Sequence, residues 1–203
     1  MKKTSYISIL VGLLFCTAVN RSGAAEISLD SPDTIIGIEY LFPVKESRDI
    51  RMINADYNWL ITEVGSVNFS LYAGLTATYA AGSITQLEGG MESGALREVH
   101  HDNSAFGFGP GLLARFRIWS GKKFLIHLNG SGNTIFYNRD FPAGGDFYNF
   151  MWRGGPSFEY GIDKLKIISV GYHWAHISNG QGTESKDPSY DAQGIMLRFS
   201  GLY

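Results

Sequence analysis

The residues of this sequence best suited to catalysis are a histidine and a serine, His176 and Ser178, near the end of a segment that alternates like a β-strand. Side chains two apart on a strand point to the same face, here ~6.5–7 Å apart along the backbone. A histidine that can take the proton of a serine hydroxyl turns the serine into a nucleophile. The neighbours on this face are apolar or aromatic, namely Ile168, Val170, Tyr172 and Trp174. The pair is therefore expected on an apolar surface.

The beginning of the chain has the layout of a secretory signal peptide. Lys2 and Lys3 precede a short apolar run, 7–18, and the small residues of 22–25 offer a cleavage site. The run is too short for a membrane-spanning helix. We expect residues 1–25 to be removed and residues 26–203 to form one domain. The single cysteine, Cys16, lies inside the expected signal peptide.

The expected mature chain is acidic and has no cysteine, so hydrogen bonds and apolar contacts must hold it together without disulfides. Cleavage removes Lys2, Lys3 and Arg21 and so changes the formal net charge from −2 to about −5. No basic surface indicates a nucleic-acid partner. No later run of 18 apolar residues could form a membrane helix. These features indicate a protein of the bacterial cell envelope.

The mature sequence divides into segments in which apolar and polar residues alternate, and none shows a sustained helical period. Gly and aromatic residues are frequent, as in all-β proteins with tight turns. The eight segments are 33–42, 50–64, 67–80, 105–119, 122–138, 146–161, 164–178 and 190–203.

Segment length and loop pattern favour an eight-stranded antiparallel transmembrane β-barrel in the bacterial outer membrane. Several segments are longer than ordinary globular strands and suit a tilted crossing of a bilayer. Long connections alternate with tight ones at 65–66, 120–121 and 162–163, which is typical of barrels with long outer loops and short periplasmic turns. An even number of strands closes the sheet without an edge. The last segment ends in the aromatic Tyr203 and carries Ile195, Leu197 and Phe199 at alternate positions, a pattern that resembles the terminal strand of such barrels.

The inward phase of these strands carries charged and polar side chains. Eight strands leave room inside for side chains only, so we expect an internal network and no pore. The four tryptophans are expected in the aromatic girdles at the membrane interfaces. The expected inward residues are Glu39, Asp56, Arg115, Arg117, His127, Arg153, Glu159 and Arg198, with His173 as a further internal hydrogen-bonding residue.

Strand order then predicts the depth of the catalytic candidates. If the N-terminus is periplasmic, the seventh strand ends at the outer surface with His176 and Ser178, and the eighth begins there with Asp191. Ser178 would attack an ester carbonyl, His176 would act as the base and Asp191 would orient the imidazole. The amide of Asn179, or backbone N–H groups of Asn179 and Gly180, could stabilise the oxyanion. This chemistry requires no cofactor, and an acylated outer-leaflet lipid fits the expected depth.

The run 176–180, His-Ile-Ser-Asn-Gly, followed by Asp187-Pro188 and an acid at the start of the last strand, resembles the C-terminal signature of the PagL-type lipid A 3-O-deacylases. That resemblance covers about the last 35 residues in detail. It implies an outer-membrane serine esterase with lipid A, the anchor of lipopolysaccharide, as its substrate and the 3-position chain as the one removed. The family has Glu where this chain has Asp191, so Glu184 or Asp187 could serve instead.

Other interpretations stay open at this point. A non-catalytic barrel acting as an adhesin or structural protein would use the loop 80–105, and a lipocalin-like carrier would turn its aromatic face inward. A metal site at His100, His101 and Asp102 is not expected, because the spacing offers no tetrahedral set. The sequence leaves open whether two barrels form a homodimer.

Overall fold

The structure is a computed structural model that describes residues 31–44, 48–89, 96–143, 145–163, 166–179 and 189–201. The expected signal peptide, with Cys16, lies outside the described residues. Gly180, Glu184, Asp187 and Tyr203 also lie outside them.

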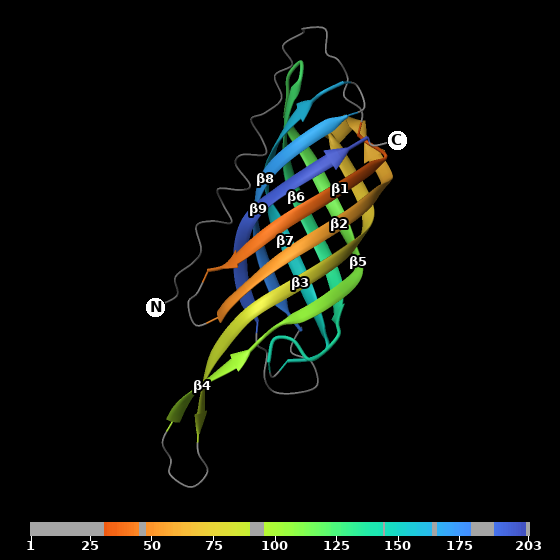
Figure 1. The fold of residues 1–203 in the computed structure, drawn as a ribbon. Helices are drawn as coiled ribbons and strands as arrows, with labels where there is room; N and C mark the ends of the chain where they lie inside the picture. The colour runs from red at the N-terminus through yellow and green to blue at the C-terminus, as the bar shows by residue number, and fades with distance from the viewer. Residues whose placement is uncertain are drawn as a thin grey trace, which may run out of the picture.

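The described residues form nine β-strands and one short 3-10 helix (Figure 1). No helix in this part of the chain is long and apolar enough to cross a membrane. The strands are β1 (Thr34–Pro43), β2 (Arg48–Val64), β3 (Phe69–Gly89), β4 (Leu96–Asp102), β5 (Ala105–Ser120), β6 (Phe124–Tyr137), β7 (Tyr148–Gly161), β8 (Ile167–Ser178) and β9 (Tyr190–Ser200), and the 3-10 helix η1 is Gly65–Val67.

Eight of the strands close into an antiparallel barrel, as the sequence predicts. The first strand pairs with both its sequence neighbour and the last strand, so that Ile36 lies opposite Tyr57 of β2 and opposite Phe199 of β9. The ring runs β1-β2-β3-β5-β6-β7-β8-β9 and returns to β1. Closure gives each strand of the ring a hydrogen-bonded partner on both sides, as a lipid environment requires.

The prediction of a loop at 80–105 is wrong, because most of this range forms a two-stranded ribbon. β3 continues to Gly89 and pairs with β4 from Ser83 opposite Asp102 to Gly89 opposite Leu96. The ribbon extends beyond the barrel, at the bottom of Figure 1. A ribbon outside the barrel wall is held by backbone hydrogen bonds and does not need one apolar face. Its sequence therefore lacks the alternation that identifies the barrel strands. His100 and His101 therefore lie in a strand and not in an open loop.

The two ends of the barrel differ in their connections. At one end, η1, residues 121–123 and residues 162–166 make short links between strands. The other end carries the β3–β4 ribbon and the connections 138–147 and 179–189. Barrels of the bacterial outer membrane turn their short links to the periplasm and their long connections to the outside. We call the second end the long-loop end.

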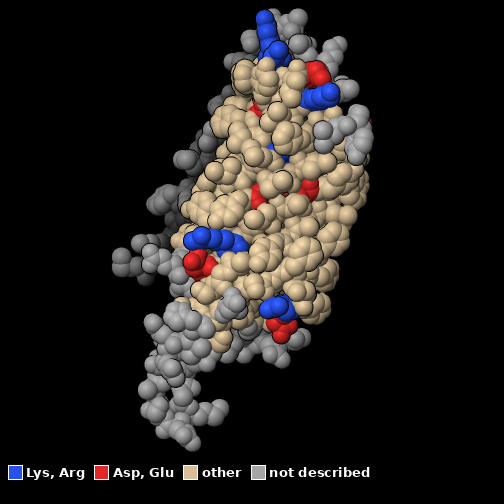
Figure 2. All heavy atoms as spheres, in the orientation of Figure 1, with Lys and Arg blue, Asp and Glu red and all other residues tan. Residues whose placement is uncertain are grey.

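The outer face of the barrel is apolar. Large hydrophobic side chains project from every strand of the ring, and Figure 2 shows Lys, Arg, Asp and Glu gathered mainly toward the two ends of the visible face. A face of this kind, with aromatic residues outside and arginines inside, is the reverse of a soluble carrier barrel. The chain is an outer-membrane barrel of bacteria. Examples of the exposed side chains are Ile38, Ile53, Phe106, Leu112, Phe158, Val170, Ile195 and Leu197.

The interior toward the short-turn end is the expected polar network. Arg153 donates from Nη1 to Glu39 Oε2 at 2.8 Å. It also donates to both carboxylate oxygens of Asp56, each at 2.9 Å. His173 Nδ1 lies 2.5 Å from Glu39 Oε1. Arg115 pairs with Glu159, and Arg117 at the mouth pairs with Glu63 at 3.4 Å. Arg117 thus has an acid that the alternation did not predict, whereas Arg198 donates from Nη1 to Oδ1 of Asn129 at 3.2 Å.

The interior toward the long-loop end is apolar, which the sequence analysis did not predict. Phe141, in the connection between β6 and β7, is fully buried and contacts the rings of Tyr137 and Tyr190. This apolar plug comprises Leu41, Ile50, Met52, Ala80, Ile84, Ala105, Ile135, Tyr137, Phe141, Met151, Ala175, Ile177, Tyr190 and Ala192. We expected a polar interior because charged residues show clearly which face of a strand points inward. An apolar residue that points inward gives no such signal, because the outer face is apolar too.

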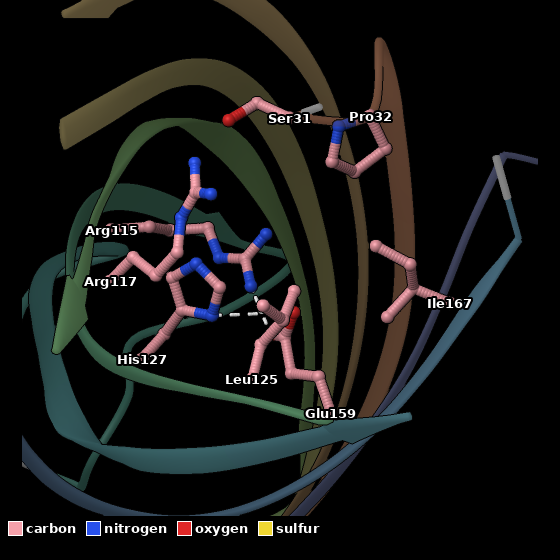
Figure 3. Close-up of a pocket in the computed structure, with 8 residues that line it drawn as sticks. All are labelled: Ser31, Pro32, Arg115, Arg117, Leu125, His127, Glu159 and Ile167. Atoms are coloured by element: carbon pink, nitrogen blue, oxygen red, sulfur yellow. Dashed lines mark hydrogen bonds and ion pairs between the residues drawn. The ribbon is translucent and has the colours of Figure 1, made fainter. Parts of the chain in front are cut away.

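A small cavity remains at the short-turn end of the interior (Figure 3). Its volume is about 10 Å³, enough for one water molecule. His127 and Arg115 both point to Glu159 across it (Figure 3), with His127 Nδ1 3.3 Å from Glu159 Oε2. A cavity of this size holds no acyl chain, and the catalytic candidates lie at the other end of the barrel.

Candidate functional site

The histidine and the acid of the predicted set face each other across two neighbouring strands. His176 in β8 is directly opposite Asp191 in β9, and Nδ1 of the histidine lies 2.8 Å from Oδ1 of the aspartate. Both side chains are on the outer face, with the histidine side chain 50% and the aspartate side chain 33% exposed. The pair therefore lies where a membrane lipid can reach it.

Ser178 ends β8 on the same outer face as His176. Residues 175 and 177 between and before them are buried inside the barrel, which confirms the alternation. Since Asp191 occupies Nδ1, the nitrogen of His176 left to accept a proton from a serine is Nε2. This is the division of labour between the two ring nitrogens in Ser-His-Asp catalysis.

Asn179 lies differently from its neighbours. Its side chain is buried and turned inward, and its Nδ2 donates to Oδ2 of Asp146 at 3.3 Å. The amide side chain therefore does not share the outer face with Ser178, which leaves the backbone N–H of Asn179 as its possible contribution to an oxyanion site. Gly180 and the alternative acids Glu184 and Asp187 lie outside the described residues.

A hollow in the outer wall adjoins the pair. Its volume is about 390 Å³, and Trp152, Gly154, Trp174, His176 and Asp191 are among the residues that line it. Gly154 is opposite Trp174 across β7 and β8. The two indole side chains, 62% and 64% exposed, stand at its sides, and the glycine contributes no side chain to fill it. The hollow is apolar except at the end formed by the histidine and the aspartate.

The alternation of the strands predicts both tryptophans on the outer face but does not predict the hollow. The available signal was a set of glycines at outward positions of neighbouring strands, where Gly130 is opposite Gly154 and Gly132 is opposite Trp152. The Trp152 ring covers Gly132 so closely that a Cβ there would lie 2.8 Å from it. Which glycines become covered and which stay open depends on side-chain placement that no pattern specifies.

The strand ends that carry the site are held from inside the barrel. Ala175 and Ile177 of β8 and Tyr190 and Ala192 of β9 all belong to the apolar plug. They alternate with His176, Ser178 and Asp191, so burial of one set fixes the outward direction of the other. The site thus sits on a firm support, as a preorganised catalytic group requires.

The described residues contain no group of three or more His, Cys, Asp or Glu side chains that could hold a metal ion. The chemistry that this arrangement can perform with its own side chains is attack of a serine on an ester, with histidine as the base.

No protein-family model and no curated protein matches the chain. Among solved structures, a similar one is the backbone structure of the Yersinia pestis outer membrane protein Ail in a phospholipid bilayer nanodisc. The match covers 83% of this chain and 100% of that chain, with 14% identity and a TM-score of 0.38. The barrel class of this chain rests on its strand pairing and its apolar outer face, and not on this likeness.

Proposed function

We propose that this outer-membrane barrel is a serine esterase of the PagL type, which hydrolyses an ester-linked acyl chain of lipid A, with the 3-position chain as the favoured target. The observation that carries the proposal is the His176–Asp191 contact of 2.8 Å on the lipid-facing side of the long-loop end, with Ser178 on the same face. A histidine–carboxylate pair on a membrane-facing wall has no evident structural purpose, because both groups would be better solvated elsewhere.

The reaction proceeds in two steps. Ser178 Oγ attacks the ester carbonyl carbon while His176 Nε2 takes its proton, and the collapsing tetrahedral intermediate releases the sugar alcohol, which receives that proton. Water then attacks the acyl-serine in the same way and frees the fatty acid. Asp191 holds the Nδ1–H and stabilises the imidazolium that forms in both steps. The backbone N–H of Asn179 supports the oxyanion.

The hollow supports a lipid as the substrate. An acyl chain lying between Trp152 and Trp174 would exchange lipid contacts for indole contacts and bring its ester to the end formed by His176 and Asp191. The long-loop end of the barrel is the level of the outer-leaflet headgroups, where ester bonds of lipid A lie.

The deciding experiment compares lipid A, by mass spectrometry, from cells that express the wild type, Ser178→Ala or Ser120→Ala. Ser120 makes a matched control because it ends β5 at the opposite end of the barrel. We expect the wild type and Ser120→Ala to remove one acyl chain and Ser178→Ala to remove none. An unchanged lipid A with the wild type would reject the function, and activity of Ser178→Ala would reject the nucleophile.

A second candidate is a non-catalytic barrel that binds a partner outside the cell, and the projecting ribbon of β3 and β4 favours it. In that case the lipid A would be the same with all three proteins. Binding to host cells or matrix would then depend on residues 83–102 and not on Ser178.

A further inference from the structure

Asn179 depends on one other residue for the direction of its side chain. The described residues give its Nδ2 a partner in Asp146 Oδ2, whereas its Oδ1 is buried without a hydrogen-bond partner. A buried amide with one bond is sensitive to the loss of that bond, because the donor would then be left buried and unsatisfied. The contact joins residues 33 apart in the sequence.

Asp146 belongs to a connection that is itself firmly held. Within it, Phe141 N donates to Asp146 O at 3.1 Å and Gly145 N donates to Pro142 O at 2.8 Å. Asn149 Nδ2 donates to Phe141 O at 2.6 Å. These bonds fix the backbone of Phe141 and Asp146, and the carboxylate of Asp146 reaches Asn179 from this position.

The same connection contacts the site from a second direction. The Phe141 ring lies edge-on against Tyr190, with the ring centroids 6.2 Å apart. Tyr190 directly precedes Asp191, and Asn179 directly follows Ser178. Through Phe141 and Asp146, the connection between β6 and β7 therefore touches one neighbour of the acid and one neighbour of the nucleophile.

We propose that Asp146 is a positioning residue of the esterase: by holding the Asn179 side chain inside the barrel, it fixes the backbone that presents the Ser178 hydroxyl and the Asn179 N–H on the outside. This inference rests on the proposed function. Because strand neighbours point to opposite faces, an anchor on the inner side of position 179 sets the direction of position 178. Loss of the anchor would misplace the nucleophile by a fraction of an ångström and slow the chemical step more than it weakens substrate binding.

The test uses the full-length protein in lipid vesicles and measures kcat and KM on lipid A. Asp146→Ala is expected to lower kcat at least about tenfold with KM nearly unchanged. Asn179→Asp is expected to do the same, because two carboxylates would then face each other. The exchange Asp146→Asn with Asn179→Asp restores one donor and one acceptor and is expected to recover most of kcat. Asp140→Ala, an exposed acid in the same connection, is the matched control and should keep wild-type kcat.

Unfolding by urea, followed through tryptophan fluorescence, distinguishes positioning from mere stability. Recovery of kcat in the exchanged pair, with all variants folded, supports the proposal. Wild-type kcat in Asp146→Ala overturns it, as does a double variant that is folded but no faster than the single ones. A wild type without activity overturns the proposed function and this inference together, whereas an active wild type with an unaffected Asp146→Ala overturns the inference alone.

Discussion

At the scale of single residues, the register of β8 and β9 gives Asp191 the reach that the acid of the proposed triad needs. His176 and Asp191 are direct cross-strand partners, so a short side chain already reaches Nδ1 at 2.8 Å. Directly opposite residues on neighbouring strands have Cβ atoms only about 4.5–5.5 Å apart. The PagL-type signature has glutamate at this position, and the strand pairing shows that the shorter Asp191 still reaches His176.

Asp191→Asn should nearly abolish activity without unfolding the barrel. The new amide can donate to Nδ1, which would force the proton onto Nε2, the nitrogen that must accept one from Ser178. We expect kcat to fall by about 10²–10⁴-fold, the range for the wrong histidine tautomer in a serine hydrolase. Release of fatty acid from lipid A measures it. Glu184→Gln and Asp187→Asn serve as comparisons, and a loss confined to either of them would move the role of the acid to that residue.

At the scale of elements, β7 and β8 form the wall against which the acyl chain of the proposed substrate would lie. Gly154 keeps the middle of this wall open. A Cβ at this position would meet only the Asn129 carbonyl oxygen, at 3.4 Å, so a side chain can be added there without a clash with the barrel. Filling the hollow is therefore possible without rebuilding the fold.

Gly154→Leu should reduce kcat/KM on lipid A by somewhat more than tenfold. A leucine would displace about two methylenes of the acyl chain from the hollow, at about 0.8 kcal/mol each. Gly154→Ala should have a smaller effect, and Ala73→Leu, an outward position of β3 in another part of the wall, should have none. Equal activity of Gly154→Leu and the wild type would show that the chain binds elsewhere.

The polar interior is also a property of the elements, since Arg153 of β7 donates to residues of four other strands, including Thr76 of β3. This guanidinium joins Glu39 of β1 and Asp56 of β2 and donates to Asn133 of β6 at 3.1 Å. Arg153→Ala would leave two buried carboxylates without their cation. We expect the free energy of unfolding in lipid vesicles to fall by about 3–5 kcal/mol. Urea titration measures this, and Arg51→Ala, an exposed arginine, should change stability little.

At the scale of the whole molecule, the barrel carries large apolar side chains on its surface and charged side chains in its interior, the reverse of a soluble protein. The tryptophans Trp59, Trp119, Trp152 and Trp174 are all exposed on its surface. In lipid vesicles we expect brominated acyl chains to quench most of the tryptophan fluorescence and aqueous iodide to quench little. The reverse result would place these side chains in water and contradict the membrane orientation.

Much of the architecture could be predicted from the sequence because barrel strands are constrained on two sides. Lipid outside and a narrow interior inside enforce strict alternation, so the phase of His176, Ser178 and Asp191 could be read directly. The same constraint predicted the inward arginines and the inward acids Glu39, Asp56 and Glu159, but not Glu63, which pairs with Arg117. The constraint on alternation does not apply to the ribbon of β3 and β4, which extends beyond the barrel. The prediction of a loop was wrong there.

By itself, the sequence determined the number of strands in the barrel, the closure of the barrel and the face and end on which the catalytic candidates lie. These follow from a local period of two residues and from chain order. Only the tertiary structure decided that His176 meets Asp191, that Asn179 turns inward to Asp146, and that Trp152 and Trp174 leave a hollow beside them. Each of these contacts joins different strands or loops, and its geometry depends on register and side-chain direction, which a one-dimensional pattern does not contain.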